Sequence, residues 1–290
     1  MQYSLRNKAL QLIVDTQGAE MVSLQYQSKE LLWQVQEAWK RYAPILFPVV
    51  GRLKNDGYTY QNKWYTMPRD GLARDKEWLC TARSQTHLQF ELTDDEETVL
   101  YYPFHFSLIV EYHLLSESEI KIVFKVFNPH YVKLPFKLGF HLAFQTFDTL
   151  NTCFVELQGN NLHFPITCCL LKNGLICSYQ APVFERSCIS LRTSLFEKEA
   201  IVLENKNITA MTLGSSKWMY RISVAAMNCT HWGIWTMPFR LKFVRLGPWV
   251  GAPDTEEAPE ALLLKKGFIY LSAYQHWQWE VRVCVSDYSV

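Results

Sequence analysis

The sequence has almost no excess of one charge. Its 29 lysine and arginine residues are balanced by 28 aspartate and glutamate residues, which leaves nothing to attract a nucleic acid or an anionic membrane. It also lacks an apolar stretch approaching the roughly 20 residues of a transmembrane helix, and its first ten residues lack the apolar segment of a signal peptide. We therefore expect a cytoplasmic protein that recognises its partner by shape and hydrogen bonding.

Metal-binding spacings of cysteine and histidine are missing as well. The eight cysteines include no C-x-x-C pair and no Cys/His block with zinc spacing, so we expect reduced, buried, apolar side chains. His105 and His113 share one face of a predicted strand with Glu111. Eight strand residues at about 3.4 Å each separate the two imidazoles by roughly 27 Å, too far for one ion. We predict no metal site.

Long amphipathic helices and Pro/Gly/Ser-rich linkers are also absent. Because no linker marks a boundary, we predict one domain that spans residues 1–290. The periodicity that is present has a repeat of two, which is typical of a β-strand. It is clearest in 102–114, and it recurs in 118–128 and 277–285. The sequence therefore predicts an all-β fold of mostly antiparallel strands.

Turn residues indicate where these strands are joined. Gly18 predicts an opening hairpin, and Asp56-Gly57 predicts another because glycine accepts the positive φ of a tight turn. Further turns are predicted at Gln61-Asn62-Lys63 and at Asn173-Gly174. A closing hairpin is expected to start at Gly267.

The segment 47–75 has the highest density of turn residues and charges in the chain. Arg52, Asp70, Arg74 and Asp75 cluster around its glycines. Such a segment is either a solvated pair of turns or a loop that presents polar groups to a site.

His141 also leaves two interpretations open. It stands alone in the apolar segment 134–144, where a histidine is either a core residue or a group with a chemical role. Aromatic residues make up 14% of the chain, and their flat apolar faces suit sugar rings as well as core packing.

Five ordered motifs together resemble the aldose 1-epimerase (galactose mutarotase-like) family, and most closely its LacX-type branch. The resemblance covers most of the chain and is weakest in 150–230. The motifs are Phe47-Pro-Val-Val-Gly-Arg-Leu, Asp70-Gly-Leu-Ala-Arg-Asp75, Tyr102-Pro-Phe-x-Phe, Leu134-Pro-Phe-x-x-Gly-x-His141-x-Ala-Phe144 and Pro248-Trp-x-Gly-x-x-Asp254.

The resemblance implies a β-supersandwich with a sugar-binding cleft, and an isomerase that interconverts the anomers of a hexose without metal or organic cofactor. A base takes the proton of the C1 hydroxyl and an acid protonates the ring oxygen as the ring opens. By resemblance, His141 is the acid and the base occupies the position of Gln275. A further family histidine matches Asp70, while Arg52 and Asp254 hold sugar hydroxyls.

The sequence departs from the family pattern at three of these positions. The family's His-Gly-Phe-Ala-Arg reads Asp70-Gly-Leu-Ala-Arg, and its Leu-x-Pro-Gly-Glu reads Leu271-Ser-Ala-Tyr-Gln275. A neutral amide lacks the basicity of a carboxylate, so Gln275 could bind the C1 hydroxyl but could not deprotonate it. The glutamate that precedes Pro-Trp in the family is matched by Gly247.

These departures leave two hypotheses of different classes. The first is an isomerase in which His141 is the acid, Asp70 or a bound water replaces the base, and Arg52, Arg74, Asp254 and Gln275 position hydroxyls. His276 reaches the site only if the alignment slips by one residue, which turns a strand side chain to the opposite face.

The second hypothesis is a carbohydrate-binding protein that has kept the cleft and lost the chemistry. A phosphorylated sugar is a further alternative, because Arg52, Arg69 and Arg74 could surround a phosphate. A small-molecule sugar is the expected partner in every case.

Overall fold

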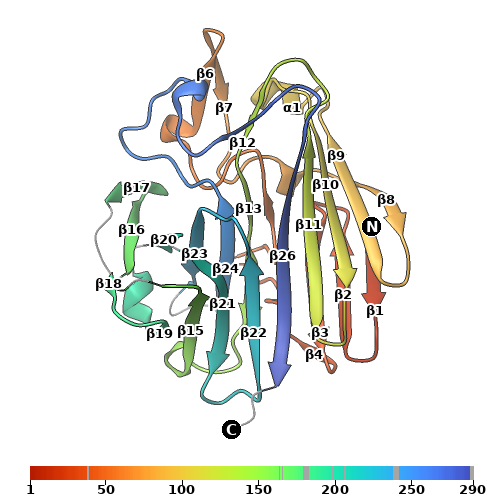
Figure 1. The fold of residues 1–290 in the computed structure, drawn as a ribbon, viewed down its shortest axis with the longest axis vertical. Coiled ribbons are helices and arrows are strands. Elements are labelled where there is room, and N and C mark those ends of the chain that lie inside the picture. Colours follow the sequence, from red (N-terminus) through yellow and green to blue (C-terminus); the bar gives the residue numbers. More distant parts are fainter. Residues whose placement is uncertain are drawn as a thin grey trace.

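The computed structural model describes residues 1–37, 39–162, 164, 166–178, 183–197, 199–205, 207–237 and 242–287. Two nine-stranded sheets dominate the fold, and the strands within them pair antiparallel (Figure 1). The predicted all-β class and the β-supersandwich are confirmed. The described part of the chain contains one short α-helix, α1 (Thr98–Tyr101), and no helix in it is long and apolar enough to cross a membrane.

The first sheet contains the longest strands. Its order is β19 (Cys188–Ser190), β15 (Cys153–Gly159), β21 (Ile208–Ser215), β22 (Tyr220–Ala226), β26 (His276–Asp287), β11 (Glu119–Phe127), β10 (Ser107–Leu114), β9 (His87–Thr93) and β8 (Leu79–Arg83).

The second sheet carries the candidate site. Its order is β17 (Leu175–Ser178), β16 (Ile166–Lys172), β20 (Ile201–Glu204), β23 (His231–Trp235), β24 (Phe243–Val250), β13 (Leu138–Phe140) and β5 (Ile45–Leu46), with β14 (Leu142–Gln145) paired to β24 and β18 (Val183–Phe184) paired to β16.

Three smaller units complete the fold. A four-stranded sheet, which packs on β9 through the rings of Tyr3 and Phe90, consists of β1 (Gln2–Arg6), β2 (Leu10–Asp15), β3 (Glu20–Tyr26) and β4 (Lys29–Glu30). Two-stranded pairs form from β6 (Gly57–Tyr60) with β7 (Lys63–Thr66), and from β12 (Leu134–Phe136) with β25 (Ile269–Leu271). Short 3₁₀ segments span Lys54–Asp56, Ala73–Asp75, Leu150–Thr152, Thr193–Phe196 and Leu262–Leu264.

The core lies between the layers. Alternate residues of β10, such as Leu108 and Val110, belong to one buried cluster with Val244 and Leu246 of β24. Because side chains of a strand alternate between its faces, the intervening Arg245 and Gly247 belong to the other face of the second sheet. The candidate site described below lies on that face.

The strand predictions are largely confirmed. The segments 118–128 and 277–285 contain β11 and β26, and Gly18 lies in the turn between β2 and β3. In 102–114 the alternate residues are buried as predicted, but β10 begins only at Ser107. Before Ser107 the backbone N–H groups bond elsewhere, since that of Phe104 donates to the Tyr102 carbonyl and that of Phe106 donates to the Asp94 carboxylate.

Two predicted hairpins are wrong. At Asp56-Gly57 the positive φ falls on Asn55 and Asp56, whereas Gly57 is extended. Gly57 is needed for space instead, because a Cβ there would lie 2.4 Å from the carbonyl oxygen of Tyr65. The turn predicted at Gln61-Asn62-Lys63 does join β6 to β7; it consists of Gln61 and Asn62, both with positive φ, and Lys63 is the first residue of β7.

The closing hairpin from Gly267 does not form either. Strand β25 pairs with β12, whereas β26 pairs with β11 and β22 in the first sheet. The expectation for cysteines holds in part. Four of the eight are buried, none forms a disulfide in the described structure, and Cys177 and Cys188 are exposed.

Candidate functional site

A cleft of about 580 Å³ opens on the outer face of the second sheet. Cavities of this size suit small molecules. Its polar lining includes Arg69, Arg74 and Arg245, the carboxylates of Asp70, Glu197 and Glu199, and His141, and its aromatic lining includes Trp39 and Trp235.

His141 lies at the break between β13 and β14, where its N–H donates to the Pro44 carbonyl (3.1 Å). Its side chain is only 2% exposed, and Nε2 has no hydrogen-bond partner. Burial, followed by the positive charges of Arg245 and other arginines of the cleft, holds the pKa of His141 well below its usual range. The imidazole is therefore neutral at neutral pH.

Asp70 is held on both of its carboxylate oxygens. Oδ1 accepts from the Gly51 N–H (2.9 Å), and Oδ2 accepts from Nη1 of Arg74 (2.7 Å). Its backbone has a positive φ of 66°, and Gly71 follows it because a Cβ there would lie 2.1 Å from the Phe47 carbonyl oxygen. The loop therefore fixes Asp70 as an acceptor for Gly51 and Arg74.

Two arginines of the cleft lining each have a buried donor without a partner. Arg74 also donates from Nη2 to the Arg69 carbonyl (2.6 Å), but its Nε has no hydrogen-bond partner and lies 3.6 Å from a carboxylate oxygen of Asp75. Nε of Arg245 is likewise without a partner, and its guanidinium lies 5.0 Å from the ring centroid of Trp235. Burial lowers the pKa of Arg245 to about 10, which still leaves it charged.

Glycines make room for Trp249 beside His141. The imidazole and indole centroids are 5.6 Å apart. A Cβ at Gly139, Gly233 or Gly247 would approach an atom of the indole to 3.0 Å or less. The indole therefore occupies the space that side chains at these three positions would need.

The isomerase hypothesis from the sequence named six site residues. Three of them, Asp70, Arg74 and His141, line the cleft together. The other three, Arg52, Asp254 and Gln275, lie outside its lining. Arg52 makes two 2.6 Å bonds to the carboxylate of Asp56. Gln275 is exposed in the turn before β26. His276 is also exposed and stacks on Phe127.

Asp254 is buried in an ion cluster. It accepts from Nζ of Lys265 at 2.5 Å and lies 3.6 Å from Nζ of Lys137. Burial lowers the pKa of Lys137 to about 8. Asp254 also accepts from the N–H of Lys54 (3.1 Å), so it ties the loop after Arg52 to the loop after β24.

Sequence reasoning missed Arg245, Trp39, Trp235, Glu197 and Glu199 as cleft residues. Arg245 carried the one available signal, since it is a charged residue inside the apolar run of 243–250. The carboxylates after Thr193–Phe196 carried none, because charged residues beside a turn are common on any surface.

Comparison with known proteins agrees with this architecture. The family model described as aldose 1-epimerase matches residues 1–197. The plasmid-encoded protein LacX of Lactococcus lactis subsp. lactis is 28% identical over 276 residues, which cover 89% of this chain and 90% of LacX.

Two solved structures are similar over nearly their whole length. A galactose mutarotase related enzyme from Lactobacillus acidophilus has a TM-score of 0.92 at 26% identity, and all of each chain is covered. A galactose mutarotase-like protein from Lactobacillus casei ATCC 334 has a TM-score of 0.92 at 25% identity, with 99% of this chain and 100% of that chain covered. The chain therefore belongs to the aldose 1-epimerase family, in its LacX-type branch.

Proposed function

We propose that the cleft binds a hexose or a hexose derivative in its ring form. The observation that carries the proposal is that three buried nitrogen atoms without hydrogen-bond partners, Arg74 Nε, His141 Nε2 and Arg245 Nε, belong to residues of this one cleft. Buried polar atoms are nearly always paired. Sugar hydroxyls supply such partners once side-chain rotation exposes these atoms to the cleft, and Trp39 and Trp235 add aromatic surface to its lining.

The charge of the lining favours a neutral sugar. Arg69, Arg74 and Arg245 are matched in number by the carboxylates of Asp70, Glu197 and Glu199. A phosphate site requires an excess of positive charge, and Arg52, which would add to it, is paired with Asp56 outside the cleft.

The geometry favours binding with little or no catalysis of anomer interconversion. That reaction needs one group to remove a proton and another to supply one. Asp70 is a poor base in this setting because both of its oxygens already accept hydrogen bonds. Position 247, where the family pattern has a glutamate, is a glycine in this chain and offers no carboxylate.

Anomer interconversion is the second candidate function. It is favoured by family membership and by the neutral His141, whose Nε2 is unpartnered and could accept a proton. The low pKa of His141 makes the imidazole a weak base, so a slow reaction is the most this arrangement supports. For either function we propose a cytoplasmic location and a single domain.

The experiment measures binding and chemistry on the same samples. Anomer exchange of a panel of pure hexoses and one hexose 6-phosphate is followed by NMR, and binding is followed by saturation-transfer NMR. We expect binding of a neutral hexose with exchange at the rate of buffer alone. Exchange faster than buffer that is lost in His141→Ala would establish the second candidate instead.

Matched variants locate the binding. Trp235→Ala removes a wall of the cleft and should weaken binding, whereas Gln275→Ala changes an exposed turn outside it and should not. No binding of any sugar in the panel, or equal binding by both variants, would overturn the proposal.

A further inference from the structure

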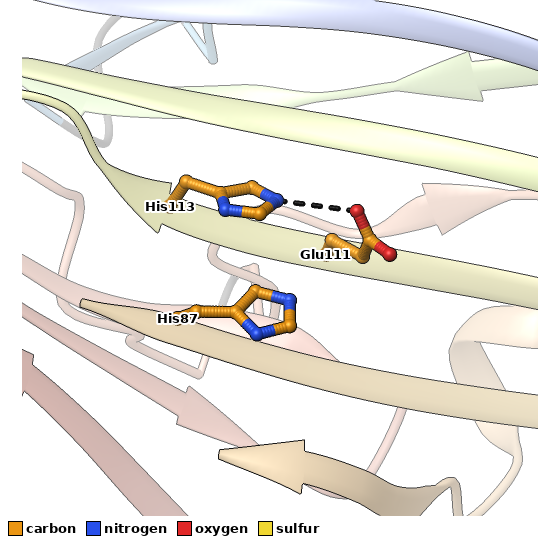
Figure 2. A group of neighbouring side chains, drawn as sticks. All are labelled: His87, Glu111 and His113. Atoms are coloured by element: carbon orange, nitrogen blue, oxygen red, sulfur yellow. Dashed lines mark hydrogen bonds and ion pairs between the residues drawn. The ribbon is translucent and has the colours of Figure 1, made fainter. Parts of the chain in front are cut away.

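A second group of chemistry-bearing side chains lies on the polar face of the first sheet. Figure 2 shows His87 on β9 beside His113 and Glu111 on β10. His87 and His113 are direct cross-strand partners, and Glu111 lies two residues before His113 on the same face. Sequence reasoning tested His113 only with His105 of the same predicted strand and so missed this group. Strand pairing brings His87 to it, and no local pattern reveals such a pairing.

The ligand atoms of the three side chains are close together. One nitrogen of each imidazole and one carboxylate oxygen all lie within 4.8 Å of one another. The imidazole centroids are 4.5 Å apart with an interplanar angle of 21°. Nε2 of His113 and Oε2 of Glu111 are 3.2 Å apart. That distance is near the roughly 3.4 Å that separates two ligands of a tetrahedral ion with bonds of about 2.1 Å.

One of these three side chains lacks a hydrogen-bond partner. Nε2 of His87 is buried and has no hydrogen-bond partner. Stacking gives neither ring a hydrogen bond, whereas an ion bound at the edges of the two rings, in the plane of each after rotation, would pair a nitrogen of both. We propose that His87, Glu111 and His113 bind one divalent cation of the zinc class, with water completing the coordination.

The donor set selects the class of ion. Two imidazole nitrogens and one carboxylate oxygen suit Zn²⁺, whereas Mg²⁺ and Ca²⁺ prefer oxygen ligands throughout. Because His87 and His113 are partly exposed, water can reach the remaining position. Closing the group requires side-chain rotation only, since cross-strand pairing already fixes the backbone positions.

Lys125 of β11 is the competing cation. Its Nζ donates to Oε1 of Glu111 at 2.6 Å, which leaves Oε2 facing His113. The ion replaces the bond between His113 and Glu111, and Oε1 stays with Lys125. Lys121, the cross-strand partner of His113, adds a second positive charge. The lysines therefore weaken the site without blocking it.

The test uses the full chain without a polyhistidine tag, after removal of metal with EDTA. ZnCl₂ is titrated by calorimetry at neutral pH, and the melting temperature is followed in parallel. We expect one Zn²⁺ per chain, a higher melting temperature, and affinity lowered by at least about tenfold in His87→Gln and in His113→Gln. His276→Gln, which removes an exposed histidine elsewhere, should bind as the unaltered chain does.

The melting temperature without metal checks that each variant is folded. X-ray absorption of the zinc-loaded unaltered chain tests the ligands without any variant and should indicate two imidazoles per ion. Absence of binding, fewer than two imidazoles, or unchanged affinity in folded His87→Gln would overturn the site. Lys125→Met should bind more tightly, because a positive charge is removed next to Glu111.

Discussion

Gly247 lies against His141 so closely that no side chain fits between them. A Cβ at position 247 would lie 2.7 Å from Cδ2 of the imidazole and 3.0 Å from the Phe140 carbonyl oxygen. Gly247→Ala should therefore destabilise the protein by about 1–3 kcal/mol, as overpacking of a close-packed site does. Urea unfolding measures this change.

Gly267→Ala is the contrasting variant for this measurement. A Cβ there would meet no atom closer than 3.7 Å, so only the positive φ of 76° opposes the substitution. The loss at position 267 should be about 1 kcal/mol, the usual cost of alanine at such a φ. No loss at position 247 would mean that the imidazole moves aside.

The same geometry predicts that restoring the family's carboxylates does not restore catalysis. Gly247→Glu cannot place its side chain without displacing His141, and Gln275→Glu adds a carboxylate in an exposed turn outside the cleft. We expect both variants to leave anomer exchange at the rate of buffer, measured by NMR. Faster exchange in Gln275→Glu would contradict this placement of the turn.

Asp70 allows a test in which two substitutions separate charge from hydrogen bonding. Asp70→Ala leaves the Gly51 N–H unpaired and Arg74 without its closest ion-pair partner, and should cost about 3–5 kcal/mol of unfolding free energy. Asp70→Asn keeps one acceptor and should cost about 2 kcal/mol. Denaturant unfolding of the two variants tests the order, and equal losses would mean that the hydrogen bond from Gly51 contributes nothing.

Local patterns predicted the elements whose signal is contained in one stretch of chain. The alternation in 118–128 predicted β11 because every second residue of that strand is buried in the core. The closing hairpin was wrong because the partner of β25 is β12, more than a hundred residues earlier, and no local pattern records such a pairing.

The site was predictable to a similar extent. Asp70, Arg74 and His141 were found through family motifs, and they do line one cleft. Arg245 joins them in the lining, and Gly247 lies against His141, only because β24 pairs with both β13 and β14. His87 and His113 meet for the same reason, through the register of β9 on β10.

His141 gives a prediction on the dependence of stability on pH. Its folded-state pKa is lowered, so between that pKa and the unfolded value of about 6.5 the unfolded chain binds more protons. The contribution of neutral His141 to the free energy of unfolding is therefore fully present above about pH 6.5 and is lost as the pH falls below that value. The loss approaches about 1.4 kcal/mol per pH unit.

Comparison with His141→Gln isolates this contribution from that of the other titrating groups. Unfolding free energies of both proteins are measured in urea at several pH values between neutral and mildly acidic. The stability advantage of the unaltered chain should shrink as the pH falls. A difference that stays constant with pH would mean that the pKa of His141 is the same in the folded and the unfolded protein.

Asp254 gives the last prediction, because its surroundings are those of a structural residue. Its carboxylate is buried with Lys265 and Lys137, whose side chains are 0% and 1% exposed. Asp254→Asn leaves two buried ammonium groups without their counter-charge and should cost about 3–5 kcal/mol. Adding Lys265→Met should recover part of that loss, since an apolar residue replaces an unpaired charge. Sugar affinity of the folded variants should be unchanged, because Asp254 does not line the cleft; unaltered stability with lost sugar binding would instead make Asp254 a direct ligand of the sugar.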